Sequence, residues 1–213
     1  MKKDEAADRG TYHHGNLREV LIQAAVQLVE EEGPANLSVR EVAKRAGVSP
    51  GAPFRHFSNK TALLTAVAEQ AMARFRLEIV AAVNAVTNGD PVDRYAAVGI
   101  AYLRWAIRNP THFQIISTRS LIDWEGSEAL RQDNEAVRAL MEEALIEAQV
   151  KKLLRSNNLA ETQIAGRALV YGLARMLIDG HFAQWGATGQ TAEETAQTVL
   201  GHFIETIRSD GKA

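Results

Sequence analysis

Residues 37–64, which read LSVREVAKRAGVSPGAPFRHFSNKTALL, constrain the fold more than any other stretch of the chain. Ser38 is placed to cap a short helix, and Gly47 can take the positive φ that ends it. Ser49 is placed to cap a second short helix with Pro50 at its first position, where a missing N–H costs nothing. Two short helices joined by a turn that contains glycine form a helix-turn-helix.

The charges of this stretch favour a nucleic-acid partner. Residues 40–60 hold five basic side chains and one acidic side chain, Glu41. In a DNA-binding helix-turn-helix, the second helix lies in the major groove and its N-terminal residues meet the base edges. The alternative is a corner between two helices of an ordinary bundle, and spacing alone leaves it open because short turns of this kind are common.

The order of residues in this stretch resembles the DNA-binding domain of the TetR (tetracycline-repressor-like) family of bacterial transcriptional regulators. The residues that carry the resemblance are Val42, Ala43, Ala46, Gly47, Val48, Ser49, Gly51, Phe54, Arg55, His56, Phe57, Lys60, Leu63 and Leu64. The resemblance covers residues 16–70, and beyond them only the helical pattern and the length agree. Two positions depart from the family pattern: Phe54 stands where tyrosine is usual, and Pro53 stands where an aliphatic residue is usual. Because Pro53 is then the fourth helical position, we expect the second helix to persist with a tightened first turn.

Nine residues of this region are candidates for DNA contacts. We expect four to contact phosphates, which positions a protein without reading sequence, namely Arg40, Phe54, His56 and Lys60. The other five are expected on or near the groove-facing turn, namely Ser49, Pro50, Gly51, Ala52 and Arg55. Arg55 is the candidate for a bidentate contact with guanine, and a phosphate contact is the alternative.

The whole chain predicts an all-α protein with about nine helices. We expect a flexible arm at residues 1–15, a three-helix DNA-binding domain at 16–60, and a larger helical ligand-binding and dimerisation domain at 61–213. A helix over 61–86 carries one apolar stripe and leads from the smaller domain into the larger. Later helices are expected over 128–156 and 160–185.

The larger domain contains many aromatic residues for a helical bundle, which favours a mostly apolar pocket for a small molecule. The candidate lining residues are Phe75, Tyr102, Trp105, Phe113, Arg119, Tyr171, Arg175 and Asp179. Two alternatives stay open. The aromatic residues can be plain core, and Arg175 and Asp179, four apart on a helix, can pair with each other.

The helix at 160–185 is apolar nearly all round, so it is expected to be buried on more than one side. Gly166 and Gly172 within it suggest the close approach of another helix. With the last helix it predicts a homodimer that buries a four-helix bundle, and the alternative is the core of a monomer. The candidate interface residues are Leu169, Gly172, Leu173, Met176, Val199, Leu200, Phe203, Ile204 and Ile207.

Composition excludes several classes of protein. There is no cysteine, so disulfides, thiolate catalysis and sulfur-ligated metals are excluded. The sequence contains no phosphate-binding glycine loop, zinc-protease motif or nucleophile elbow, so we expect neither an enzyme nor a cofactor. His13 and His14 lack further ligands nearby, so no metal is expected. With no apolar run long enough for a bilayer and no signal segment, we expect a cytoplasmic protein without membrane contact.

The resemblance to the TetR family implies a homodimeric regulator, most often a repressor, that binds a palindromic operator in double-stranded DNA and is released by a small-molecule effector. Two other interpretations remain at this point. One is a helical small-molecule-binding or catalytic bundle whose basic end is incidental. The other is a DNA-bound factor that acts through a protein partner, without a small-molecule effector.

Overall fold

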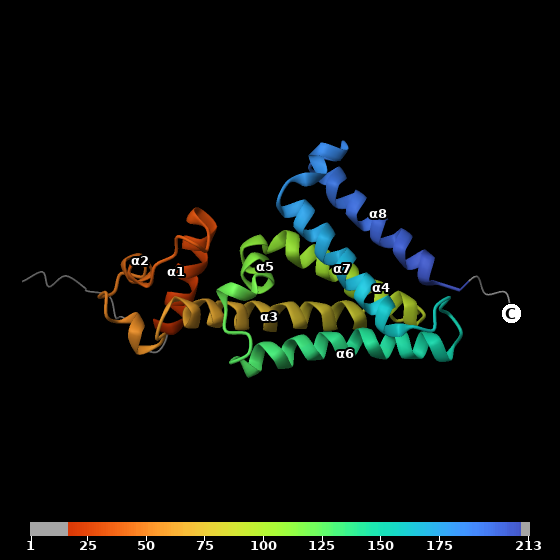
Figure 1. Cartoon of the computed structure of the whole chain (residues 1–213), viewed down its shortest axis with the longest axis horizontal. Helices are drawn as coiled ribbons and strands as arrows, with labels where there is room; N and C mark the ends of the chain where they lie inside the picture. The colour runs from red at the N-terminus through yellow and green to blue at the C-terminus, as the bar shows by residue number, and fades with distance from the viewer. Residues whose placement is uncertain (1–16, 210–213) are drawn as a thin grey trace, which may run out of the picture. The chain divides into compact units, whose positions relative to one another are not determined.

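The computed structural model describes residues 17–209, within which every regular element is a helix apart from one isolated β-bridge (Figure 1). In chain order the elements are α1 (Leu17–Glu32), α2 (Val39–Arg45), η1 (Pro53–Arg55), α3 (Lys60–Asn84), α4 (Pro91–Arg108), α5 (Pro110–Ser117), η2 (Arg119–Leu121), α6 (Glu128–Val150), α7 (Leu159–Ile178), η3 (His181–Trp185) and α8 (Gln190–Ile207). The elements written η are short 3₁₀ helices. The all-α prediction is confirmed. The predicted arm at 1–15 lies outside the described residues.

The chain divides into two compact units, and the division falls between Leu64 and Thr65, inside α3. The first turn of α3 therefore belongs to the N-terminal unit, and the rest of this 25-residue helix belongs to the C-terminal unit.

The N-terminal unit is built on contacts of α1 with α2, and its core is apolar. Leu21, Ile22, Val42 and Leu63 have no exposed surface, as expected for side chains on the facing sides of amphipathic helices. The predicted cap of α2 is confirmed, since the hydroxyl oxygen of Ser38 accepts the N–H of Glu41 at 3.1 Å.

The second short helix of the predicted helix-turn-helix is the main correction to the fold. No regular α-helix starts at Ser49; residues 50–52 form turns, and only a 3₁₀ turn follows at η1. The N–H groups of Ala52, Arg55 and His56 each donate to the carbonyl three residues earlier. Pro53 has no N–H to give the Ser49 carbonyl, so the tighter bond from Ala52 takes that acceptor.

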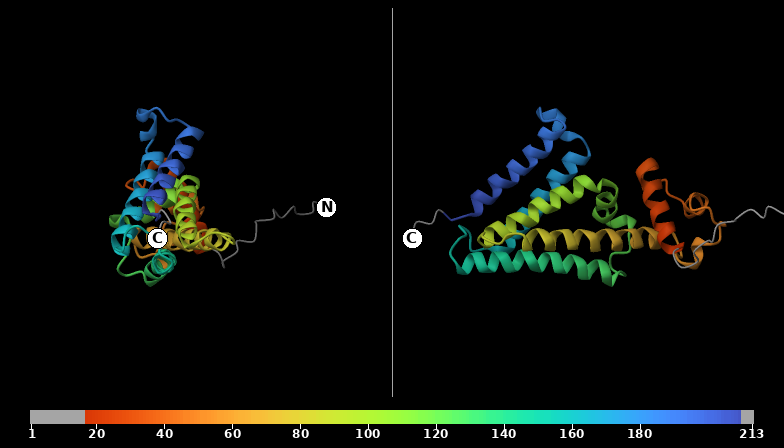
Figure 2. Two further views of the ribbon diagram at one scale, coloured as in Figure 1. Left: turned by 90° about the vertical axis from the view of Figure 1, so that its right-hand side faces the viewer. Right: turned by 180° about the vertical axis from the view of Figure 1, so that it is seen from behind.

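In the C-terminal unit, α4 packs against α6, α7 and α8, and α7 also packs against α8 (Figures 1 and 2). An apolar face of α4 suits this central place, because Val92, Leu103 and Ala106 are fully buried. The helix starts with a reciprocal capping box, in which Asp90 and Asp93 each accept the other's backbone N–H. The carboxylate of Asp133 on α6 accepts from Arg76 of α3 at 2.6 Å, which joins these two helices.

Two helices end earlier than the sequence predicts. The helix predicted over 128–156 stops at Val150, because Lys152 takes φ +56° and the Leu153 N–H turns back to the Ala148 carbonyl. The helix predicted over 160–185 stops at Ile178, since Gly180 takes φ +74° and starts the separate η3 turn. In both places a left-handed residue reverses the chain at the helix end.

Candidate functional site

The predicted DNA-binding residues all lie in the N-terminal unit, between α2 and the first residue of α3. Seven of the nine are exposed, namely Arg40, Ser49, Pro50, Gly51, Phe54, Arg55 and His56, and the other two, Ala52 and Lys60, are half-buried. Phe54 leaves 51% of its surface exposed, which is unusual for a large apolar side chain. Phe57, three residues later, is buried at 3% and anchors this segment to the core. The buried Phe57 side chain thus holds the segment on the core of the unit, while the exposed side chains of the segment stay accessible.

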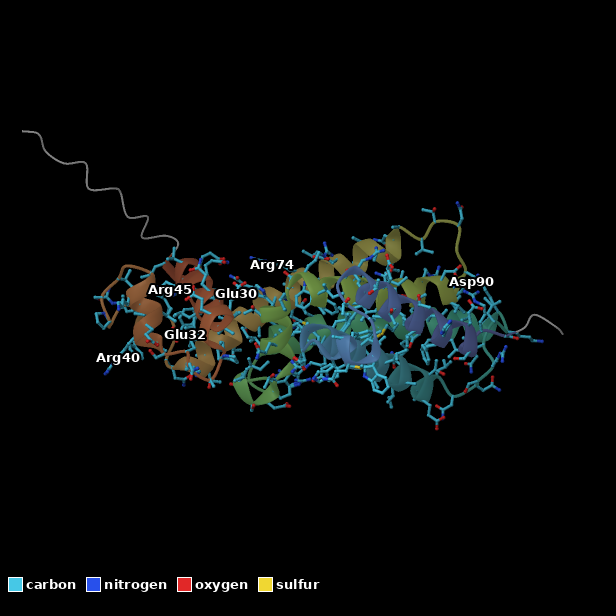
Figure 3. The ribbon with its side chains drawn as sticks, turned by 90° about the horizontal axis from the view of Figure 1, so that it is seen from above. Glu30, Glu32, Arg40, Arg45, Arg74 and Asp90 are labelled. Atoms are coloured by element: carbon cyan, nitrogen blue, oxygen red, sulfur yellow. The ribbon has the colours of Figure 1, made fainter. Side chains whose placement is uncertain are left out.

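The basic residues of this unit divide into free and paired ones. Arg40 extends from the surface of the unit (Figure 3). Arg45 instead forms a two-point ion pair with Glu31 of α1, at 2.6 and 2.5 Å, and this hydrogen bonding lowers the pKa of Glu31. Lys60 donates to the carbonyl of Ala35 at 2.7 Å, which leaves two of its three N–H donors for another partner.

A cavity of about 380 Å³ lies in the C-terminal unit, lined by side chains from α3 to α8. Its floor is a cluster of rings that meet edge to face, which is the favoured geometry for aromatic pairs. The centre of the Tyr102 ring lies 5.4 Å from that of Phe75 and 6.0 Å from that of Phe113. The cavity has the size and the mostly apolar lining of a small-molecule site.

Five of the eight residues predicted for a ligand pocket line this cavity, namely Phe75, Tyr102, Phe113, Arg119 and Tyr171. Trp105, Arg175 and Asp179 do not. Trp105 is core, with 2% of its surface exposed and its ring edge-on to Phe75. Arg175 and Asp179 form an ion pair with each other at 3.0 Å, which is the alternative that their spacing left open.

Sequence reasoning missed most of the other residues of the cavity wall, among them Tyr95 and Arg167. The guanidinium carbon of Arg167 lies 4.8 Å from the centre of the Tyr102 ring and 5.8 Å from that of Tyr171. Arg119 stacks in the same way on Trp124, at 3.2 Å. The signal for Arg167 was present in the sequence, because it is one of two charged residues in the apolar part of its helix.

Burial shifts the titration of Tyr95 and Tyr102 in the cavity wall. It raises the pKa of Tyr95 to about 12. It also raises the pKa of Tyr102, against the opposing effect of the nearby positive charge of Arg167. Both phenols are therefore neutral hydrogen-bonding groups at physiological pH, and the hydroxyl of Tyr95 donates to the Thr162 carbonyl at 3.3 Å.

The predicted dimer residues divide into two sets. Leu173, Leu200 and Ile204 are buried within the protomer, and Leu200 and Ile204 also line the cavity, so a contact of these three with a second copy stays a prediction. The others are exposed at Val199 and half-buried at Leu169, Gly172, Met176, Phe203 and Ile207. Further exposed apolar surface on α7 comes from Ile164, at 69%.

Residues 17–209 also bear on two other classes of site. No helix there is both long and apolar enough to cross a bilayer. In the same range, no three histidine or acidic side chains come together in a way that could hold a metal ion.

Comparison with known families matches both units of the chain. The family described as bacterial regulatory proteins, tetR family, matches residues 21–67. The family described as tetracyclin repressor-like, C-terminal domain, matches residues 95–203.

Individual relatives agree with these matches. The HTH-type transcriptional regulator BetI of Stenotrophomonas maltophilia is 37% identical over 81 residues, which are 38% of this chain and 41% of that relative. The nucleoid occlusion factor SlmA of Aliivibrio fischeri is 28% identical over 202 residues, 92% of this chain and 87% of that one. A solved structure of a protein of unknown function from Rhodococcus sp. RHA1 matches with a TM-score of 0.77 and 25% identity, over 94% of this chain and 100% of that one. Because one family model matches its N-terminal segment and the other matches its C-terminal domain, the chain belongs to the TetR family and is a transcriptional regulator.

Proposed function

We propose that this chain is a repressor that binds a palindromic operator in double-stranded DNA as a homodimer and is released when a small molecule enters its cavity. The observation that carries the proposal is the course of α3. This helix begins directly after the exposed turn with Arg55 and His56, and it lines the cavity with Met72 and Phe75. An occupant that contacts α3 differently in two conformations shifts the balance between them, which is what an effector must do.

The DNA-binding role is proposed for residues 16–60, and the ligand and dimer roles for residues 61–213. Arg40, Phe54, His56 and Lys60 would contact phosphates, and Arg55 would contact a base or a phosphate. Ser49, Pro50, Gly51 and Ala52 would form the backbone that approaches the groove. The exposure of all of these residues except Ala52 and Lys60, which are half-buried, supports these roles.

The homodimer is proposed through α7 and α8. A two-fold assembly places two such segments about one DNA turn apart, roughly 34–36 Å, so that together they read a palindrome. Exposed Ile164 and Val199 and the open space beside Gly172 support this face. We further propose that the protein works in the cytoplasm, without catalysis, cofactor or metal.

The experiment is selection of purified protein against randomised duplex DNA at two salt concentrations. Recovery of a palindrome with half-sites about one helical turn apart supports the proposal. Sequence-independent binding that weakens steeply with salt would reduce the N-terminal unit to a general phosphate-binding surface.

A second candidate is a DNA-bound factor that acts through a protein partner, since one relative is named a nucleoid occlusion factor and not a transcriptional regulator. The two candidates differ in what removes the protein from its site. A repressor leaves the selected operator when a small molecule fills the cavity, whereas a factor of the second kind stays on DNA and captures its partner there.

A further inference from the structure

We propose that the cavity takes an amphipathic organic anion, with its apolar body on the aromatic floor and its carboxylate or phosphate between Arg119 and Arg167. This inference rests on the proposed function, because it names the chemical class of the effector.

The floor of the cavity is suited to an apolar body. Phe113, Phe75 and Leu200 have only 1%, 4% and 3% of their surfaces exposed, and Val170 closes the same wall at 6%. Transfer of hydrocarbon from water onto such a surface is favourable in proportion to the apolar area that becomes buried.

Two arginines at the rim of this floor are oriented by aromatic rings. Arg167 lies over Tyr102 and Arg119 lies over Trp124, and both arginines are exposed residues that also line the cavity. Stacking uses the flat face of a guanidinium and leaves its edge, which carries the N–H donors, for a planar or tetrahedral anion. The rim therefore presents two oriented forks of donors above an apolar floor.

The charges of these two arginines are not neutralised by a close carboxylate. Among residues 17–209, neither guanidinium has an acidic side chain within 4.0 Å. Arg138, a third arginine of the wall, is paired with both Glu135 at 2.6 Å and Glu142 at 2.9 Å. Arg119 and Arg167 thus hold the charge that remains for a ligand.

The electrostatics of Arg119 agree with this assignment. Burial lowers its pKa, the negative charge of Glu125 opposes that shift, and the positive charge of Arg167 adds to it. The two guanidinium groups are therefore close enough to repel each other. An anion between them offsets the repulsion of the two positive charges. This makes the free energy of anion binding more favourable.

A cationic ligand is the opposite possibility, because aromatic pockets also bind cations over their ring faces. Here the faces of Tyr102 and Trp124 are already taken by guanidinium groups. A ligand cation on either ring would lie close to an arginine, and on the remaining rings it would still share the cavity with two positive charges. The arrangement therefore selects for negative charge.

The test is calorimetric titration of the purified full chain, free of DNA, with three groups of probes. Decanoate and decyl phosphate share the apolar chain with decanol, which is neutral, and with decyltrimethylammonium, which is positive. We expect one or both anions to bind more tightly than the neutral and positive probes. Arg167→Gln should weaken the anion roughly tenfold to a hundredfold, as expected for a lost charge-assisted contact, and Arg167→Lys should restore part of it.

The matched control is Arg74→Gln, which removes an exposed arginine of α3 that does not line the cavity and should leave binding unchanged. Circular dichroism of each variant shows that it is folded. The inference is overturned if neither anion binds more tightly than decanol and decyltrimethylammonium, or if Arg167→Gln and Arg74→Gln behave alike.

The titration separates this inference from the proposed function. Anion binding that depends on Arg167, in a protein that selects no operator, supports the anion site and contradicts the repressor. An operator from which none of the anions releases the protein, and no anion binding to the free chain, overturns the anion site while the DNA-binding function stands.

Discussion

Gly166 of α7 lies so close to the hydroxyl of Tyr95 on α4 that a Cβ atom at position 166 would overlap it. That hydroxyl belongs to a buried residue and donates to the Thr162 carbonyl, so moving it away from position 166 disturbs this hydrogen bond. Gly166→Ala must therefore push the Tyr95 ring or break its hydrogen bond. We expect a loss of about 1–3 kcal/mol in the free energy of unfolding, measured by urea denaturation.

A second substitution isolates the cause of that loss. In a Tyr95→Phe background the overlapping oxygen is absent, so Gly166→Ala should cost less there than in the wild type. A double-mutant cycle measures the difference as a coupling energy. Equal costs in both backgrounds would show that the contact with Tyr95 is not what excludes a larger residue.

The contact between Gly166 and Tyr95 also shows how much of the helix packing could be predicted from the sequence. Both glycines of the apolar helix, Gly166 and Gly172, predict the close approach of another helix. The structure confirms this at Gly166, whereas a Cβ at Gly172 would meet no atom of the same chain within 4 Å. The sequence shows that a helix contains small residues. Which of them faces a neighbouring helix depends on how each helix is rotated about its axis when the helices pack.

Which residues line the cavity also depends on how the helices pack, and not on local sequence alone. Arg167 and Arg175 are the two charged residues of an otherwise apolar stretch, and they lie eight residues apart, roughly 80° around the helix. One lies over Tyr102 at the cavity and the other pairs with Asp179. The neighbour that separates their roles, Tyr102, comes from α4, so no local pattern could distinguish them. Local signals did suffice at Ser38 and Gly47, because caps and left-handed turns depend on only a few adjacent residues.

Alkaline pH should destabilise the C-terminal unit through Tyr95. Burial raises the pKa of this phenol to about 12, whereas an unfolded tyrosine titrates near 10. Because the folded pKa is the higher one, the stabilisation is complete below about pH 10 and is lost as the pH rises toward about 12, by up to about 2–3 kcal/mol.

Urea denaturation at a series of pH values from neutral to alkaline measures this effect. Tyr95→Phe should flatten the alkaline fall, and the remaining slope should come from Tyr102, whose pKa burial also raises. A variant with the same alkaline profile as the wild type would contradict the assignment to Tyr95.

The turn after α2 depends on the left-handed conformation of Gly47, whose φ is +69°. Gly47→Ala should therefore lower the free energy of unfolding by about 1–2 kcal/mol. Gly51→Ala is the matched control, because a Cβ at Gly51 meets nothing within 4 Å and its φ is not positive. Thermal unfolding should show a lower melting temperature for the first variant and an unchanged or slightly higher one for the second. Equal losses would mean that backbone strain at Gly47 is not the cause.

Arg55 offers the sharpest test of sequence readout, because its side chain is exposed and it closes the 3₁₀ turn of η1. We expect Arg55→Ala to weaken binding to the selected operator by about 1–3 kcal/mol, in fluorescence anisotropy at fixed salt. Binding to random duplex should change less. Arg74→Ala, which removes an equal charge from α3, should leave operator affinity nearly unchanged. An equal loss on operator and random DNA would assign Arg55 to phosphate.

The exposed face of α7 and α8 predicts how the homodimer can be separated. In a two-fold interface each side chain occurs twice, so one substitution introduces two charges into a partly desolvated contact. Val199→Glu should therefore yield monomers at concentrations where the wild type is dimeric, as measured by analytical ultracentrifugation. Leu77→Glu is the matched control, since Leu77 is more exposed, at 59%, but lies on α3. If Val199→Glu stays dimeric, or if Leu77→Glu dissociates instead, the interface lies elsewhere than on α7 and α8.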